Sequence, residues 1–469
     1  MISISSIKKK LGQKALEVLI IVISVVVLIY FLISLYFSKH YFFHTIVNGV
    51  DVSLKSYTEA EHLLEQYVND YELMILGRTG NEKITRQQIG LSYQNNNQLK
   101  QLLYNQSKPR WVMSLFGTQY YNIENLYQFN KGELLQRIEQ LRCMTENYIE
   151  PKNVSFHYNN GYYEIEAEIN GTKIIKGKLI SVIQNYILSG KKELNLSGEN
   201  CYEDPIYTLA SKKTLQTANL LNRYVTAKIT YLIDDKREII DGRIINLWLT
   251  VNEELDVEIN KTALKEYVKA LAKKYDTVGI NREFRASTGK FVTIKGGLYG
   301  WKINKEEEQK ALRANIEKGE VINREPVYIQ RALSREGNEI GDTYVEINIT
   351  RQMIWFYKDG KLITQGQIVT GNPNKGHATV VGAYMLNYKQ KGSVLSGPGY
   401  RAEVTYWMPF YGNIGIHDAT WRYAFGGVIY KTRGSHGCVN APKYVAKKIF
   451  ENIEPGIPII CYEEEKSIP

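Results

Sequence analysis

The distribution of apolar and polar positions divides the chain into stretches with different periods. The first is an uncharged apolar run from Val18 to Phe37, which as a helix would be about 30 Å long, the thickness of a bilayer's hydrocarbon core. Basic residues precede this run: Lys8, Lys9, Lys10 and Lys14. Because basic residues tend to stay in the cytoplasm, we expect a cytoplasmic tail (1–17), one transmembrane helix (18–37) and an extracytoplasmic remainder at the cell surface. The alternative is a cleaved signal peptide, but no small-residue cleavage site follows the run.

A helical period occurs twice in the middle of the chain. Ser56 and Glu59 have the spacing of a capping box. The apolar face that follows comprises Ala60, Leu63, Leu64, Tyr67 and Val68. After the candidate N-cap Asn260, the same spacing is shared by Leu264, Tyr267, Val268, Leu271 and Ala272. We therefore expect residues 43–320 to be an α+β region of one or two modules, in which a module is weakly repeated. The alternative is two unrelated α+β segments.

Turn signals mark the strands of this region. Asn159-Asn160-Gly161 is one such signal, and Asp234-Asp235 lies between strand-like residues 226–233 and 239–240, which predicts a hairpin. Residues 321–342 have no clear period and carry mixed charge. We expect them to be a linker.

Strict alternation begins at Thr343. Val345, Ile347 and Ile349 alternate with polar residues, and Asp359-Gly360 predicts a tight turn before a return strand. A helical period returns only after Pro442. The fold class we predict is therefore α+β and multidomain: an N-terminal transmembrane helix, an α+β middle region and a mostly-β, sandwich-like C-terminal domain over residues 343–464.

Composition narrows the choice of function. The 469 residues include 23% charged and 44% hydrophobic positions, which excludes a mostly disordered chain. The net charge of +10 is spread along the sequence, and an outside location removes nucleic acid as a partner. Two of Cys143, Cys201 and Cys461 could form a disulfide there. No C-x-x-C occurs, so we expect no structural metal site.

The candidate chemistry lies near the C-terminus, where His417 is followed at some distance by Cys438. A thiolate is a strong nucleophile, and a neighbouring imidazole increases its population at neutral pH. Gly437, directly before the cysteine, permits a tight turn that could aim backbone amides at an oxyanion. The alternatives are a buried structural cysteine and a zinc site made by His417, His436 and Cys438, although no fourth ligand is evident.

The pattern H-x17-S-H-G-C-x-N, from His417 to Asn440, resembles the signature of the L,D-transpeptidase (YkuD-type) family. Residues 369–371 and 377–382 resemble the family's upstream segments, with Val380 in place of the usual proline. The region before residue 343 is similar to the peptidoglycan-binding region of membrane-anchored members. The resemblance implies a cysteine nucleophile, Cys438, and a proton shuttle, His417, oriented by the backbone carbonyl of Asp418.

Further roles follow from the same resemblance. Amides of Gly437 and Cys438 would hold the oxyanion, while Ser435, His436 and Asn440 would shape the pocket; Asn440 could equally close a turn. Possible contacts with the substrate are Arg401, Arg422, Arg433, Tyr406, Trp407, Trp421 and Tyr423. The alternative is that the arginines are solvated and the aromatic side chains belong to the core.

The resemblance also implies an activity. Such an enzyme forms a thioester with a peptidoglycan stem peptide and makes 3→3 cross-links, without cofactor or metal, and carbapenem-type β-lactams would inhibit it covalently. With water as acceptor it would be an L,D-carboxypeptidase, a hydrolase. One rival is a sortase-like transpeptidase, but such enzymes have an arginine after the catalytic cysteine and none follows Cys438. The other rival is a non-catalytic wall-binding anchor.

Overall fold

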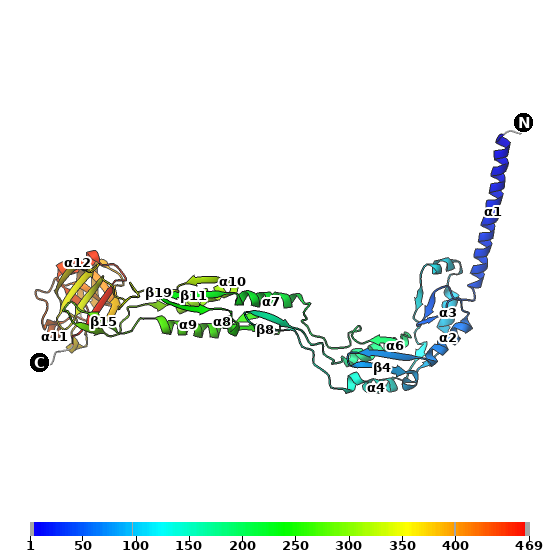
Figure 1. Ribbon diagram of the computed structural model, residues 1–469, viewed down its shortest axis with the longest axis horizontal. Coiled ribbons are helices and arrows are strands. Elements are labelled where there is room, and N and C mark those ends of the chain that lie inside the picture. Colours follow the sequence, from blue (N-terminus) through cyan, green and yellow to red (C-terminus); the bar gives the residue numbers. More distant parts are fainter. Residues whose placement is uncertain (1–3, 96, 398–399, 465–469) are drawn as a thin grey trace. The chain divides into compact units, whose positions relative to one another are not determined.

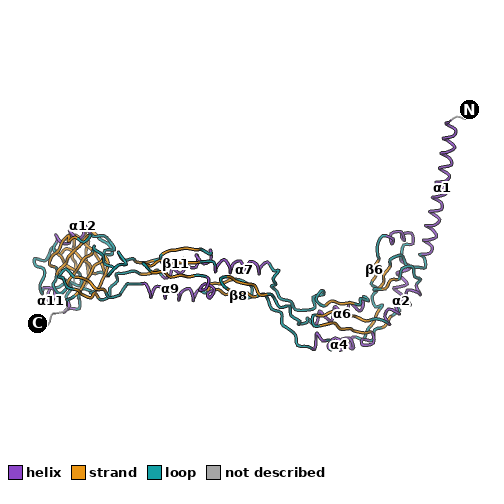
Figure 2. Tube along the Cα trace, in the orientation of Figure 1, coloured by secondary structure: helices purple, strands orange, loops and turns teal. Residues whose placement is uncertain are grey.

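The computed structural model describes residues 4–95, 97–397 and 400–464. The chain separates into two compact units, residues 1–156 with 165–214 and residues 157–164 with 215–469 (Figure 1). Figure 2 shows that helices and strands alternate through the middle region, whereas strands dominate the C-terminal part.

The first unit starts with the long helix α1 (Ile4–Tyr36). Its segment Gly12–Tyr36 is long and apolar enough to cross a membrane, and none of it is buried, a property that signal sequences share. The predicted apolar helix is therefore present and begins before residue 18. Residues 1–3 of the expected tail lie outside the described residues.

A small three-stranded sheet in the order β10-β3-β4 organises the rest of this unit. The capping box of α2 is present, because Ser56 and Glu59 bond each other's backbone amides, and Ala60, Leu64 and Val68 are buried. The strands are β1 (Thr45–Val47), β2 (Val50–Asp51), β3 (Glu72–Gly77), β4 (Gly80–Thr85), β5 (Ser92–Tyr93), β6 (Gln119–Tyr121), β7 (Tyr127–Gln128) and β10 (Glu193–Asn195). The helices are α2 (Tyr57–Asn69), η1 (Arg86–Ile89), α3 (Asn97–Asn105), η2 (Lys108–Leu115), α4 (Lys131–Glu139), α5 (Arg142–Thr145) and α6 (Lys176–Leu188).

The second unit begins with a related arrangement, in which the sheet order is β12-β11-β18. Its strands before residue 343 are β8 (Ser155–Asn159), β9 (Tyr162–Glu166), β11 (Lys228–Ile233), β12 (Lys236–Ile240), β13 (Leu249–Val251), β14 (Val257–Ile259), β15 (Arg282–Arg285), β16 (Phe291–Ile294), β17 (Lys302–Ile303), β18 (Val321–Arg324) and β19 (Tyr328–Gln330). The helices are α7 (Lys212–Val225), α8 (Gly242–Ile245), η3 (Asn246–Trp248), α9 (Lys261–Tyr275) and α10 (Lys305–Lys318). The turn predicted at Asn159-Asn160-Gly161 joins β8 to β9, and the hairpin predicted around Asp234-Asp235 is β11–β12.

The repeat expected in the middle region has a different register from the predicted one. In both units a helix (α2 or α7) precedes an antiparallel hairpin, which then pairs with a parallel strand from far along the chain (β10 or β18). The counterpart of α2 is therefore α7, and the predicted correspondence of α2 with α9 is wrong. The counterpart of α9 is α4: Asn130 and Asn260 cap these two helices in the same way.

Residues 321–342 are not an extended linker. They contribute β18, which pairs with β11, and β19, which pairs with β17. Ile340 is buried in a core with Phe284 and Tyr462, and Glu339 forms a buried ion pair with Arg282 at 2.6 Å. The segment therefore packs against both the middle module and the C-terminal strands of this unit.

The C-terminal part has two sheets, in the orders β22-β21-β20-β28-β23 and β24-β25-β26-β27. Their strands are β20 (Tyr344–Asn348), β21 (Met353–Lys358), β22 (Lys361–Gln367), β23 (Gly382–Met385), β24 (Gln390–Gly397), β25 (Tyr400–Tyr411), β26 (Ile414–Asp418), β27 (Val439–Ala441) and β28 (Pro458–Tyr462). The helices are η4 (Pro373–Lys375), α11 (Ile429–Arg433) and α12 (Lys443–Asn452). One core joins both sheets and α12, as expected for a sandwich.

The four cysteines are all free, so the structure contains no disulfide between Cys143, Cys201 and Cys461. Cys201 and Cys461 are fully buried. The disulfide considered from the outside location is therefore absent, and these two residues act as small apolar core residues.

Candidate active site

The candidate base lies in β26, and the candidate nucleophile directly precedes the neighbouring parallel strand β27. In the β26–β27 pair, His417 lies opposite Asn440. Cys438 lies two residues before Asn440, directly ahead of β27, and its side chain lines the same cavity as that of His417. Local pairing thus brings together two residues that are far apart in the sequence.

Both side chains line one cavity of about 460 Å³. Its wall comprises Leu395, Tyr400, Arg401, Ala402, Glu403, His417, Trp421, Arg422, Gly434, Ser435, His436, Cys438 and Asn440. The cavity thus combines a thiol, an imidazole, guanidinium groups and aromatic walls, a combination that suits a polar peptide.

One hydrogen bond determines the tautomer of His417. Nδ1 lies 2.9 Å from the Asp418 carbonyl oxygen, which can only accept. Nδ1 therefore carries the proton, and Nε2 is left as a base. The rings of Trp407 and Trp421 each lie 5.9 Å from the imidazole and restrict its rotation.

Burial favours the neutral forms of both groups. It raises the pKa of the Cys438 thiol to about 11, while a hydrogen bond with the Gly415 amide lowers it less. The thiol lies 3.4 Å from the Asn413 carbonyl, an acceptor that also favours the protonated form. Burial lowers the pKa of His417, against smaller opposing effects of Asp418. Burial therefore favours a thiol and a neutral imidazole, whereas the sequence led us to expect a larger thiolate population at neutral pH.

The loop before Cys438 is held by one side chain from an upstream segment, Thr379, and by one of its own, Ser435. Thr379 Oγ1 donates to the Gly437 carbonyl at 2.6 Å and accepts the Gly371 amide at 2.9 Å. Ser435 Oγ donates to the Cys438 carbonyl at 2.5 Å and accepts the Gly437 amide at 3.1 Å. The Gly437 amide is thus already bonded within the turn, so its predicted role in holding an oxyanion conflicts with this geometry.

The other motif residues differ in their surroundings. The ring of His436 stacks on Tyr400 with centroids 4.5 Å apart. Asn440 is buried, and its Oδ1 has no hydrogen-bond partner. The Asp418 carboxylate accepts the amides of Thr405 and Tyr406, both at 2.8 Å, so it fixes β25 and β26 rather than bonding the imidazole.

The expected substrate contacts divide into two groups. Arg422 and Arg401 line the cavity, whereas Arg433 does not. Tyr406 is buried in the core between the sheets, so its predicted substrate contact is wrong. Trp407 lies opposite His417 and packs against its ring without lining the cavity.

Sequence reasoning missed Tyr400, Asn413 and the bracing role of Thr379. Tyr400 begins β25 and lines the cavity, although it has the same parity as the core residues Tyr406 and Met408, so the alternation along the strand could not have assigned it to the cavity. The contact of Asn413 is made by its backbone carbonyl, which leaves no signal in the sequence. Thr379 lies in a segment recognised by resemblance, but its partners are distant in sequence.

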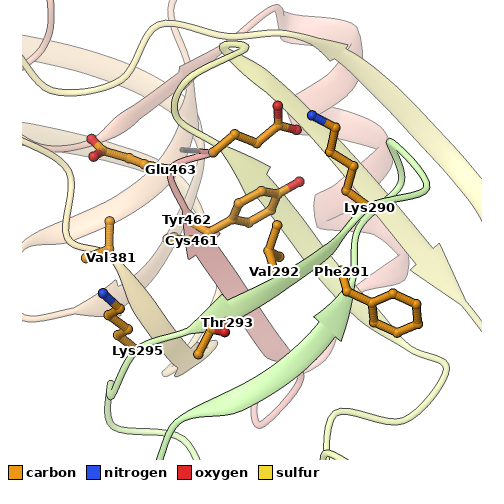
Figure 3. Close-up of a pocket in the computed structure, with 10 residues that line it drawn as sticks. Lys290, Phe291, Val292, Thr293, Lys295, Val381, Cys461, Tyr462 and Glu463 are labelled. Carbon is orange, nitrogen blue, oxygen red and sulfur yellow. The ribbon is translucent and has the colours of Figure 1, made fainter. Parts of the chain in front are cut away.

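A second cavity, of about 630 Å³, lies between the β15–β16 hairpin and the end of β28 (Figure 3). It is lined by Lys290, Phe291, Val292, Thr293, Lys295, Val381, Cys461, Tyr462, Glu463 and Glu464. None of the predicted catalytic residues belongs to this wall. Within residues 4–95, 97–397 and 400–464, no cluster of three or more His, Cys, Asp or Glu side chains is arranged to hold a metal ion.

Family comparisons match both halves of the chain. The model of the YkuD family, described as the L,D-transpeptidase catalytic domain, matches residues 342–461. A second model, described as "Putative peptidoglycan binding domain", matches residues 82–195 and again residues 208–323. No curated protein matches the chain.

Solved structures show the same likeness. The Ldtfm-avibactam carbamoyl enzyme is 33% identical over 54% of this chain and 99% of its own, with a TM-score of 0.43. A cysteine-to-serine mutant of Enterococcus faecium L,D-transpeptidase is 33% identical over 54% of this chain and all of its own, with a TM-score of 0.42. The catalytic domain of the E. faecium enzyme acylated by ertapenem is 39% identical over 26% of this chain and 97% of its own, with a TM-score of 0.24. The likeness rests on sequence identity over whole solved chains.

Proposed function

We propose a reaction from the premise that this chain belongs to the L,D-transpeptidase family. Membership makes it an acyltransferase that cross-links peptidoglycan. The proposal concerns what the family alone leaves open: the nucleophile, the order of proton transfers, the bond that is made and where the enzyme acts.

The first step is attack by Cys438 on the carbonyl carbon of the third residue of a tetrapeptide stem. As the carbon–sulfur bond forms, the thiol proton passes to Nε2 of His417 and the carbonyl oxygen becomes an oxyanion, held by the Cys438 amide. The carbon–nitrogen bond then breaks, and His417 returns the proton to the departing D-alanine amine. A thioester on Cys438 remains.

The second step transfers the acyl group to the side-chain amine of a diamino acid on another stem. The amine attacks the thioester carbon and gives a proton to Nε2, and the sulfur leaves and is protonated again. The product is a 3→3 cross-link. Both steps need His417 to begin as a neutral base, which is the form that its burial favours.

Arg422 supports recognition of the donor stem. Its guanidinium lines the cavity, and its Nε is buried without a hydrogen-bond partner. Burial, and to a smaller extent the charge of Arg433, lowers the pKa of Arg422. A carboxylate would relieve both effects, and the D-alanine carboxylate lies one residue beyond the scissile carbonyl. We assign Arg422 to that carboxylate, as a bidentate contact.

The rest of the chain suits delivery of this site to the wall. The two middle segments match a family associated with peptidoglycan binding, so residues 43–320 would hold glycan or stem near the enzyme. The apolar helix α1 would anchor the chain in the cell membrane as a single span, with the catalytic domain outside. A relative solved acylated by ertapenem supports carbapenem-type β-lactams as covalent ligands of Cys438.

The observation that carries the proposal is the fixed tautomer of His417 in the cavity that Cys438 also lines. The test is incubation of the full chain with ertapenem, followed by peptide mapping. We expect one adduct, on Cys438, which is lost in Cys438→Ala and kept in the matched control Cys143→Ala. An adduct that maps elsewhere, or none at all, contradicts the proposal.

A further inference from the structure

The segment from Lys108 to Phe116 lies beside the C-terminal end of α1 (Figure 1). Three kinds of contact fix it there. Tyr30 of α1 donates to the Pro109 carbonyl, Gln106 Nε2 donates to the Phe37 carbonyl at 2.8 Å, and Trp111 packs on Phe37 with ring centroids 6.0 Å apart. The segment therefore has a defined height along α1.

That height is the expected outer boundary of the membrane. A span of about twenty residues that starts after Lys14 ends near Ser34, and one that starts at Val18 ends near Phe37. Either way, the stretch Tyr30–Phe37, which η2 contacts, crosses from hydrocarbon to headgroups. Whatever η2 exposes on its free side therefore meets lipid rather than bulk water.

The side chains of η2 are segregated with a period of three, as expected for a 3-10 helix, in which residues i and i+3 share a face. Trp111 and Ser114 are buried. Arg110, Met113 and Phe116 form another face and are exposed, and Phe116 has 86% of its surface accessible. Exposed Leu115 and Lys108 flank this face. Apolar and aromatic side chains beside basic residues are the composition of an interfacial membrane element.

We propose that this surface, comprising Lys108, Arg110, Met113, Leu115 and Phe116, inserts into the outer leaflet of the membrane and binds anionic phospholipid headgroups. Met113, Leu115 and Phe116 enter the acyl-chain boundary, while Lys108 and Arg110 contact phosphates. The first unit is thereby held at two points, α1 and η2, instead of turning freely about a single helix. This inference rests on the proposed membrane anchor and is independent of the chemistry at Cys438.

The test uses the full chain in phosphatidylglycerol–phosphatidylcholine vesicles that contain a phosphatidylcholine with a diazirine in its acyl chain. After illumination, adducts are mapped by mass spectrometry on the peptides 111–131 and 291–295. The second peptide is a matched control, because Phe291 is also 73% exposed but lies in the other unit. We expect about tenfold more adduct on 111–131 than on 291–295, together with labelling of α1.

The outcomes separate the two claims. If α1 is labelled but peptide 111–131 carries no more adduct than peptide 291–295, the inference is overturned and the membrane anchor stands. Unlabelled α1 overturns the anchor and the inference together. The double variant Met113→Ser/Phe116→Ser should lower the labelling of peptide 111–131 several-fold without changing the labelling of α1. Phe291→Ser should change the labelling of neither segment. Protection of 111–131 from hydrogen exchange without lipid adducts would indicate a protein partner and also overturn the lipid assignment.

Discussion

Alkylation of Cys438 by iodoacetamide should be slow at neutral pH and should accelerate with rising pH. Burial and the Asn413 carbonyl favour the thiol, and the pKa rises from 9.0 to about 11. That rise in the pKa corresponds to about 3 kcal/mol against ionisation. At pH 7 the thiolate fraction is then roughly one hundredth of that of an ordinary cysteine with a pKa of 9.0.

The assay is the rate of adduct formation on the Cys438 peptide of the full chain, measured from pH 6 to 10. We expect about a tenfold increase per pH unit. His417→Gln should change this rate by less than about threefold, because no ion pair is lost, but should slow acylation by ertapenem by about 10²–10⁴-fold, because the base is lost. Rapid, pH-independent alkylation at neutral pH that His417→Gln abolishes would refute the neutral pair.

Further predictions concern the groups around the nucleophile. Thr379→Val should lower the free energy of unfolding by about 1–3 kcal/mol in urea titrations, because it leaves the Gly437 carbonyl unpaired. Thr379→Ser keeps the hydroxyl and should retain most of the original stability. Gly437→Ala should cost about 1–3 kcal/mol in thermal unfolding, since φ is +120° and a Cβ would lie 3.2 Å from Ile414. Arg422→Gln should abolish the preference for a tetrapeptide acid over its C-terminal amide, measured as a loss of about 10–150-fold in kcat/KM for the acid only. The pKa of His417 is lowered from 6.5, so the unfolded chain binds the proton more readily, and stability should fall as pH drops below 6.5; a urea series of His417→Gln should lack that part of the slope.

Local patterns predicted the elements that depend on neighbours in sequence. The Ser56 cap, the Asp359-Gly360 turn and the helix after Pro442 all occur, because each is determined within one turn or hairpin. The middle repeat was predicted with the wrong register. Its sheets are completed by parallel strands, β10 and β18, that come from far along the chain, and no local period specifies such pairing.

The site shows the same division. The order and spacing of His417 and Cys438 identified the pair, but the alternation along a strand does not decide which aromatic side chains face the cavity. In β25, Tyr406, Met408 and Phe410 lie in the core between the sheets, which places Tyr406 away from the substrate. The bond from the Gly437 amide to Ser435 could not be predicted, because it depends on the conformation of the turn.

The most direct test of the central claim is intact-mass analysis of the full chain with a disaccharide tetrapeptide, followed by analysis of the released muropeptides. We predict an acyl adduct on Cys438 equal to the stem without its terminal D-alanine, and dimers joined between two third residues. If monomers shortened by D-alanine were the sole product, the second step would be hydrolysis of the thioester instead of cross-linking. No adduct on Cys438, or turnover that persists in Cys438→Ala, would contradict the account.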